Sequence, residues 1–183
     1  AMKVLNAAAE VYGFTVEANE YPYGTQHFLD TGEKFPESAL DEMRKHDAIY
    51  LGAIGDPRVE VGMMERAIIA GIRFKLDLFV NLRPIKLYDE RLCPLKGKKP
   101  EDVDFVVVRE NTEDAYAGIG GILKKDTPNE VATQTMIYTR DGVERVIRYA
   151  FELARKRGKK KRLTLVDKAN AIRAQDIWTR VFA

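Results

Sequence analysis

Residues 106–121, VVVRENTEDAYAGIGG, lead from a run of valines directly into a dense group of charges. The continuous apolar stretch DFVVVRE (104–110) predicts a buried strand. Polar side chains crowd its end: Arg109, Glu110, Glu113, Asp114 and Tyr116. Ligands of α/β proteins bind beyond the carboxyl ends of such strands. The stretch therefore predicts one wall of a binding site, although a plain polar loop after a strand would also fit.

Outward from this stretch, predicted strands alternate with predicted helices. Strands are expected at 15–24, 48–55, 80–88, 104–110 and 162–168, and helices at 1–12, 38–46, 63–79 and 141–157. Residues 127–139 alternate loosely and predict an exposed β-arm. Helix-end signals are Gly13, Ser38, the pair Asp141 and Glu144, and Gly158. The alternation predicts an α/β fold with a mostly parallel sheet.

Composition narrows the class of protein. The 183 residues are 45% hydrophobic and 32% charged with a net charge of +2, which is typical of a globular protein and gives no sign of a nucleic-acid or membrane binder. Cys93 is the only cysteine, so an internal disulfide is excluded and a reduced, cytoplasmic setting is expected. No apolar run reaches the roughly 20 residues that span a bilayer.

Candidate chemistry rests on arginines from separate segments together with a tyrosine and a lysine. Arg73, Arg83 and Arg109 each lie at the edge of an apolar run, and their planar guanidinium groups suit carboxylates. They could equally be surface arginines. Tyr116 is a candidate general acid or a rim residue. Lys168 ends a predicted strand and is a candidate base, or the ion partner of Asp167.

Other conspicuous motifs carry less weight. RKRGKKKR (155–162) contains no aromatic residue and lies at a predicted helix C-terminus, where cations favour the helix dipole, so nucleic-acid binding is not expected. The glycines of GIGG (118–121) match no phosphate-loop spacing. His27 and His46 show no metal-ligand spacing.

Three motifs together resemble a known family. NLRP (81–84), VVVRENTEDAYAG (106–118) and LVDKAN (165–170) occur in the order found in the β-decarboxylating hydroxyacid dehydrogenases. These enzymes include isopropylmalate, isocitrate, homoisocitrate and tartrate/malate dehydrogenases. The resemblance covers nearly the whole chain and implies their two-domain fold, with a β-arm in the smaller domain.

The resemblance also implies roles for individual residues. Arg73, Arg83 and Arg109 match the arginines that hold the malate part of the substrate. Tyr116 matches the catalytic tyrosine. Lys168 matches the catalytic lysine, which in the family's homodimer reaches into the partner's site, and Asn170 matches a residue near the nicotinamide. NAD, with NADP as an alternative, and Mg²⁺ or Mn²⁺ are the implied cofactors.

The family pattern predicts that the chain is an internal fragment. A helical pattern is already running at Ala1, and another is still running at Ala183. Residues 1–78 would be part of the large cofactor-bearing domain, and 79–183 part of the small substrate and dimerisation domain. No metal ligand is expected in this segment. The fragment alone is expected to be inactive.

The helix before Arg73 carries the prediction of the substrate. Where isocitrate enzymes have a serine and an asparagine, this chain has Ala67 and Ile69, which cannot hydrogen-bond a γ-carboxylate. Ile68 and Ile69 offer an apolar wall for an isopropyl group, or are ordinary core residues. The predicted substrate is 3-isopropylmalate, an intermediate of leucine biosynthesis.

Alternatives stay open at this point. The sequence RENTEDAYAG is more similar to that of isocitrate enzymes. VNLRPIKL resembles tartrate/D-malate dehydrogenases, and in such an enzyme Arg66 could reach a second carboxylate of the substrate. Homoisocitrate is a further option, although Ala70 stands where those enzymes have an arginine. A non-catalytic regulatory subunit is the alternative from another class; the retained tyrosine, lysine and arginines count against it.

Overall fold

A computed structural model describes residues 2–183 of the chain. The chain forms two compact units, Ala1–Ile69 and Ala70–Ala183. The assignment of 1–78 and 79–183 to a cofactor domain and a dimerisation domain concerns their function and stays a prediction.

The first unit is helical. It contains α1 (Met2–Tyr12), α2 (Thr25–Thr31) and α3 (Glu37–Met43). Its buried apolar side chains are Ala39, Leu40, Met43, Ile54, Met64 and Ile68. The buried Thr25 hydroxyl donates to the Ile54 carbonyl at 2.8 Å, which ties the start of α2 to this core. Gly13 ends α1 with a positive φ of 69°, as its pattern predicted.

Ser38 is not the cap of α3. The helix begins at Glu37, directly after the extended backbone of Pro36, and no side chain caps it. Ser38 is therefore already inside the first turn, where its hydroxyl is past the position that accepts the orphan N–H groups.

The helix predicted over 63–79 ends at Lys75. A π-helical section, η1 (Glu65–Ala70), is followed by α4 (Gly71–Lys75). Asp77 adopts a φ of 50°, and the Leu78 N–H donates to the Arg73 carbonyl at 2.9 Å. This left-handed ending satisfies the last carbonyls and turns the chain into the first strand.

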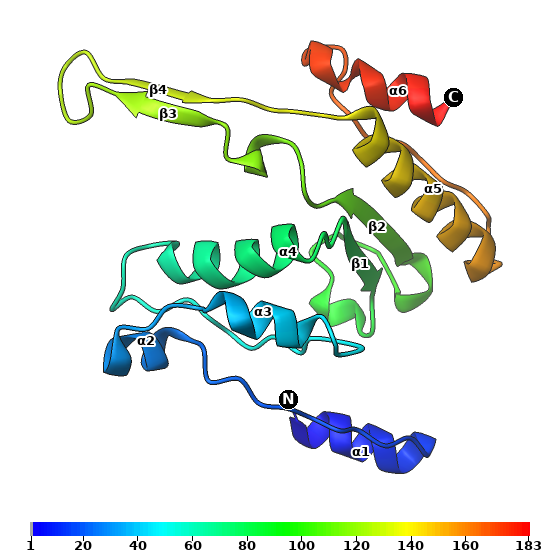
Figure 1. Ribbon diagram of the computed structural model, residues 1–183. Helices are drawn as coiled ribbons and strands as arrows, with labels where there is room; N and C mark the ends of the chain where they lie inside the picture. Colours follow the sequence, from blue (N-terminus) through cyan, green and yellow to red (C-terminus); the bar gives the residue numbers. More distant parts are fainter. Residues whose placement is uncertain (1) are drawn as a thin grey trace. The chain divides into compact units, whose positions relative to one another are not determined.

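The second unit is built on an antiparallel strand pair. β1 (Val80–Lys86) pairs with β2 (Asp104–Glu110), so that Asn81 lies opposite Arg109 and Arg83 opposite Val107. Helix α5 (Arg140–Arg157) packs against β2 (Figure 1), and its buried residues include Val143, Val146, Ile147 and Ala150. The short η5 (Arg173–Gln175) leads into α6 (Asp176–Phe182), which contacts α5.

The ends of α5 show one correct and one wrong prediction. Gly158 terminates the helix in the left-handed conformation, as expected. The Asp141 and Glu144 capping box is wrong, because the helix starts one residue earlier, at Arg140. Thr139 is its cap, and the Thr139 hydroxyl accepts from the Gly142 N–H at 3.0 Å.

The predicted β-arm is confirmed. β3 (Gly120–Leu123) pairs antiparallel with β4 (Val131–Gln134), and both strands are exposed along their length. Figure 1 shows this hairpin extending away from the β1–β2 pair within the second unit.

The parallel strands are where the prediction fails. Within residues 2–183 both sheets are two-stranded and antiparallel, and 15–24, 48–55 and 162–168 have no strand partner. Strand propensity alone does not make a parallel strand, because the ladder requires a neighbour with a complementary row of N–H and C=O groups. Within residues 2–183, none of these three stretches pairs with a neighbour in that way.

Candidate active site

The centre of the candidate site is Tyr116. It lies on a short 3₁₀ turn, η4 (Ala115–Ala117), beyond the end of β2 and is 55% exposed. The guanidinium carbon of Arg109 is 5.0 Å from the centroid of its ring, and that of Arg73 is 6.0 Å from it. Cations over an aromatic face are attracted by its quadrupole. The structure therefore brings together three residues that the sequence offered from three separate segments.

Arg83 lies on the same face of the strand pair as Arg109. Asn81 lies opposite Arg109, and Arg83 is two residues further along β1, so all three side chains lie on one side of the strand pair. The Arg83 Nε donates to the Asn81 side chain at 2.7 Å, and the Asn81 amide donates to Asn111 at 3.2 Å. Arg83 is exposed, so its remaining donors face solvent. This face can offer several guanidinium groups to a carboxylic acid.

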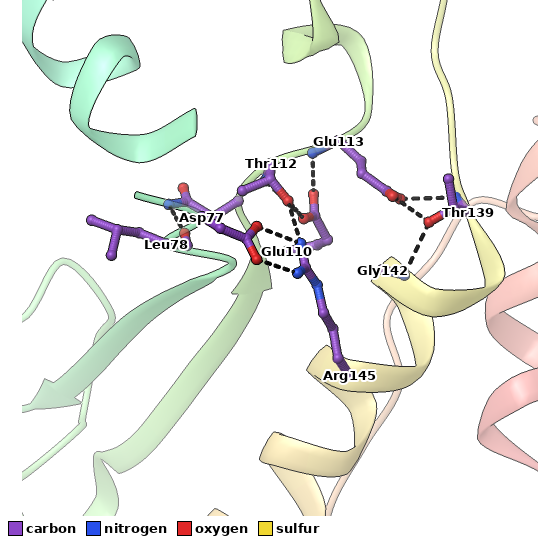
Figure 2. A network of polar contacts seen from close by, with 9 residues as sticks. Asp77, Leu78, Glu110, Thr112, Glu113, Thr139, Gly142 and Arg145 are labelled. Atoms are coloured by element: carbon purple, nitrogen blue, oxygen red, sulfur yellow. Dashed lines mark hydrogen bonds and ion pairs between the residues drawn. The ribbon is translucent and has the colours of Figure 1, made fainter. Parts of the chain in front are cut away.

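The acidic residues after Arg109 hold the backbone of the turn. The Glu110 carboxylate accepts from the Thr112 N–H at 2.7 Å, the Thr112 hydroxyl at 2.7 Å and the Glu113 N–H at 2.8 Å. The Glu113 carboxylate accepts from the Thr139 N–H at 2.9 Å and from the Thr139 hydroxyl (Figure 2). Glu113 thus ties the strand end to the cap of α5.

Arg145 of α5 completes this network. Figure 2 shows its guanidinium reaching the Asp77 carboxylate, with distances of 2.7 and 2.9 Å, and the Thr112 hydroxyl at 3.0 Å. The group also lies 4.6 Å from the centroid of the Phe79 ring. Hydrogen bonding to Asp77 raises the pKa of Arg145 above its usual value. The loop after α4, the end of β2 and the start of α5 are therefore joined by one cation.

Lys168 lies in a different setting from the one expected. The side chain is exposed and has no hydrogen bond or ion pair within residues 2–183, so the alternative pairing with Asp167 is not seen. Its backbone is well held, because the N–H donates to Gln175 Oε1 at 2.6 Å and the carbonyl accepts from Ala171 and Ile172. Asn170 is exposed in the same turn.

A cleft of about 950 Å³ lies in the second unit, between β2, α5, α6 and residues 159–167. Arg109, Tyr116 and Asp167 line it, together with Tyr138, Gln175 and Trp178. Residues 162–167 thus line the same cleft as β2, although no ladder joins them. The cleft brings the two motif-bearing segments to one place.

Ile68 and Ile69 differ in their surroundings. Ile68 is 1% exposed and belongs to the core, whereas Ile69 is half-buried. Of the two residues predicted to form the apolar wall, only Ile69 has exposed surface that a substrate could contact. Arg66 is engaged by Glu60 at 3.0 Å and by the Val61 carbonyl at 3.4 Å.

Several contributing residues had no signal in the sequence. Arg145 resembles its neighbours on the polar face of α5, and nothing near Tyr138 or Gln175 marks them. Their partners lie far along the chain, so local pattern cannot find them. Within residues 2–183, no group of three or more His, Cys, Asp or Glu side chains could hold a metal ion. In the same range, no helix combines the length and apolarity needed to cross a membrane.

Comparison with known proteins agrees with the motifs. The family model described as "Isocitrate/isopropylmalate dehydrogenase" matches residues 1–183. A 3-isopropylmalate dehydrogenase of Thermobifida fusca (strain YX) is 50% identical over 181 residues, which are 98% of this chain and 51% of that protein. One of Bifidobacterium longum (strain DJO10A) is 48% identical over 183 residues, covering 99% of this chain and 52% of that protein.

Solved structures agree as well. Isocitrate dehydrogenase from Methylococcus capsulatus has a TM-score of 0.79 at 31% identity and covers 98% of this chain and 51% of its own. A beta-decarboxylating dehydrogenase from Thermococcus kodakarensis has a TM-score of 0.66 at 30% identity, covering 98% and 49%. The predicted α/β fold class is confirmed, and the chain spans about half the length of these relatives. It belongs to the isocitrate/isopropylmalate dehydrogenase family.

Proposed function

We propose that the protein containing this sequence catalyses the NAD(P)-dependent oxidative decarboxylation of 3-isopropylmalate to 2-oxoisocaproate, a step of leucine biosynthesis. The observation that carries the proposal is the gathering of Arg73 and Arg109 over the Tyr116 ring. Two guanidinium groups beside a phenol can hold a carboxylate next to a proton donor. The relatives at 48–50% identity bear the name of this activity.

Arg73, Arg83 and Arg109 bind the carboxylates of the substrate. Binding helps the rate only where it is stronger in the transition state, so their main task is orientation. Once carbon dioxide has left, Tyr116 donates its hydroxyl proton to the substrate carbon that had carried the departing carboxylate. Its exposed ring, held beside two arginines, is available to a ligand from solvent.

Lys168 accepts the proton of the substrate hydroxyl, directly or through a water. In the proposed homodimer it serves the partner's site, which agrees with a side chain that is exposed and unpaired within residues 2–183. Asn170, exposed in the same turn, would lie near the nicotinamide.

The nicotinamide, when bound, accepts the hydride from the carbon that bears the hydroxyl. Mg²⁺ or Mn²⁺ is the metal we propose for the whole protein. The described residues contain no cluster of His, Cys, Asp or Glu side chains that fits it.

The apolar character of Ile69 supports isopropylmalate over isocitrate. A γ-carboxylate placed against Ala67 and Ile69 would lose hydrogen bonds, at a cost on the order of 1–3 kcal/mol. Arg66, the candidate for a second carboxylate in a tartrate or D-malate enzyme, is already paired with Glu60. Homoisocitrate would need a cation where Ala70 stands.

Steady-state kinetics of the whole protein on 3-isopropylmalate, isocitrate, homoisocitrate and D-malate test the proposal. We expect kcat/KM to be highest for 3-isopropylmalate, by roughly 10–200-fold over isocitrate. A higher value for isocitrate would overturn the choice of substrate. Absence of turnover on all four would favour a regulatory subunit.

A further inference from the structure

A continuous chain of hydrogen bonds joins the Tyr116 turn to the Lys168 turn. The Lys168 N–H donates to Gln175 Oε1 at 2.6 Å, and Gln175 Nε2 donates to the Tyr138 hydroxyl at 3.0 Å. The Tyr138 hydroxyl donates to Asp114 Oδ1 at 2.8 Å. All four residues belong to the second unit.

Every donor in this chain points towards the Asp114 carboxylate. Hydrogen bonds aligned in one direction polarise and strengthen one another, and a charged acceptor at the end strengthens the last bond. The orientation of the Gln175 amide is fixed, because its oxygen must face an N–H and its nitrogen must face a hydroxyl. The chain therefore has one consistent arrangement.

Tyr138 is held in place by more than its hydroxyl. Its ring meets Trp178 edge-on, with centroids 6.4 Å apart and planes at 79°. Burial, as the largest cause, raises the pKa of Tyr138 above its ordinary value, and the hydrogen bond to Asp114 adds to the rise. The hydroxyl consequently stays protonated and remains a donor at neutral pH.

Asp114 is the last acceptor of this series of hydrogen bonds, and it directly precedes the turn that contains Tyr116. Its φ of 66° and ψ of −151° form a conformation that non-glycine residues rarely adopt, at a cost on the order of 1–3 kcal/mol. Local bonds hold it there: the Asp114 N–H donates to the Ile137 carbonyl at 2.9 Å, and Oδ1 also accepts from the Ala115 N–H at 2.8 Å. The residue that sets the direction of η4 is thus the terminal acceptor of the chain.

We infer that Tyr138 and Gln175 are positioning residues, which hold the backbone turns of the proposed acid Tyr116 and the proposed base Lys168, the latter serving the partner's site in the proposed homodimer. The inference rests on the proposed function. It adds two residues that contact neither reacting group and that act through the bonds of Asp114 and the Lys168 N–H.

Tyr138→Phe in the whole protein is the direct test. It keeps the ring against Trp178 and removes only the hydroxyl, so Asp114 Oδ1 keeps the Ala115 N–H but loses the Tyr138 donor, and Gln175 Nε2 loses its acceptor. We expect kcat on 3-isopropylmalate to fall about tenfold, with KM changed less than about twofold, because sub-ångström displacement of reacting groups lowers rate more than binding. Amide hydrogen exchange at Lys168 and Ala115 should become faster.

Tyr149→Phe is the matched control. Tyr149 lies on α5, is half-buried, and its hydroxyl has no hydrogen bond within the described part of the chain. Its removal should change neither kcat nor exchange at Lys168. Gln175→Ala should reproduce the loss of kcat. Asp114→Asn, which keeps an acceptor oxygen and tolerates a positive φ, should retain several-fold more activity than Asp114→Ala.

The outcomes separate this inference from the proposed function. A wild type active on 3-isopropylmalate whose Tyr138→Phe variant matches Tyr149→Phe in kcat would overturn the inference and leave the function intact. Faster amide hydrogen exchange at Lys168 and Ala115 with unchanged kcat would also overturn the inference, since the series of hydrogen bonds would then affect structure and not catalysis. A wild type without turnover on any of the four acids would instead remove the proposed function, and this inference with it.

Discussion

Two turns carry the candidate chemistry, and they are held in different ways. The turn at 110–117 is closed by its own carboxylates, because Glu110 and Asp114 accept from neighbouring backbone N–H groups and Glu113 accepts from Thr139. The turn at 167–172 has a local bond from Ala169 to Asp167, but its link to the rest of the unit is Gln175.

The two turns differ in which contacts hold the residues of each motif in place. The bonds from Thr112 and Glu113 to Glu110 are local, so this part of the first turn can form as soon as the strand is paired, whereas the bond of Glu113 to Thr139 also needs α5. A turn whose anchor lies at the start of a later helix is in place only when that helix has docked. The acids that made the first motif conspicuous therefore position the backbone, whereas the lysine side chain of the second motif has no hydrogen bond or ion pair within residues 2–183.

Lys168→Met should have the largest effect. If Lys168 is the base, its loss should lower kcat on 3-isopropylmalate by at least about 10²–10⁴-fold in the whole protein, while thermal stability changes little because the side chain is exposed. Kinetics and a thermal melt measure the two quantities. Unchanged turnover would show that the turn at 167–172 does not present a catalytic base, and the contrast with the turn at 110–117 would no longer hold.

Glu113→Ala should have the next largest effect, on stability. It leaves the Thr139 N–H and hydroxyl without their acceptor and removes one link between the turn and the start of α5, while the bond from Arg145 to Thr112 remains. We expect the free energy of unfolding to fall by about 1–3 kcal/mol in urea titration. Glu152→Ala, on an exposed part of the same helix, is the control and should change it by less than about 0.5 kcal/mol. Equal effects of the two variants would show that the first turn does not depend on this bond.

Arg145→Met should cost less, about 1–2 kcal/mol of unfolding free energy. The guanidinium is partly buried, but Asp77 is 63% exposed, so solvent screens their attraction. Methionine retains contact with Phe79 and loses the bonds to Asp77 and Thr112. A double-mutant cycle with Asp77→Ala isolates the pair. A coupling energy of zero would remove Arg145 from the anchors of the first turn.

Asp104→Asn should have the smallest effect and a characteristic pH dependence. Asp104, at the start of β2, bonds Lys159 and Arg157, and the bond to Lys159 is the largest cause of its lowered pKa. Its folded pKa lies below the unfolded one, so its stabilisation is present above the unfolded value near 3.9 and is lost as pH falls through the folded value.

Melting curves across pH measure this contribution. The melting temperature of the wild type should exceed that of Asp104→Asn at neutral pH, and this difference in melting temperature should vanish in strong acid. A constant difference at all pH values would contradict the assignment. The result bears on the comparison because Asp104 joins β2, which leads to the first turn, to residues 157–159, which lead to the second.

Local pattern predicted what local forces decide. The valines of 104–110 form β2, although none of its residues is fully buried as expected. Gly158 ends α5, and residues 131–134, within the predicted 127–139, form one strand of the exposed arm. Tyr116, Arg73 and Arg109 were offered separately by the sequence, and the structure brings them together. Gln175 could not be predicted, because its role depends on residues 138 and 168, which reach it only in three dimensions. Residues 162–168 failed as a strand for the same reason, since a strand needs a paired neighbour.

Gly142 has a consequence for protein engineering. It lies in the first turn of α5, where replacing glycine by alanine is a standard route to a more stable helix. Here an added methyl group would strike the Glu113 carboxylate, with Oε2 only 2.7 Å from the new carbon. That carboxylate is held by Thr139 and cannot withdraw without giving up its bonds. A consensus-style design that reads only helix propensity would therefore loosen the turn that carries Tyr116.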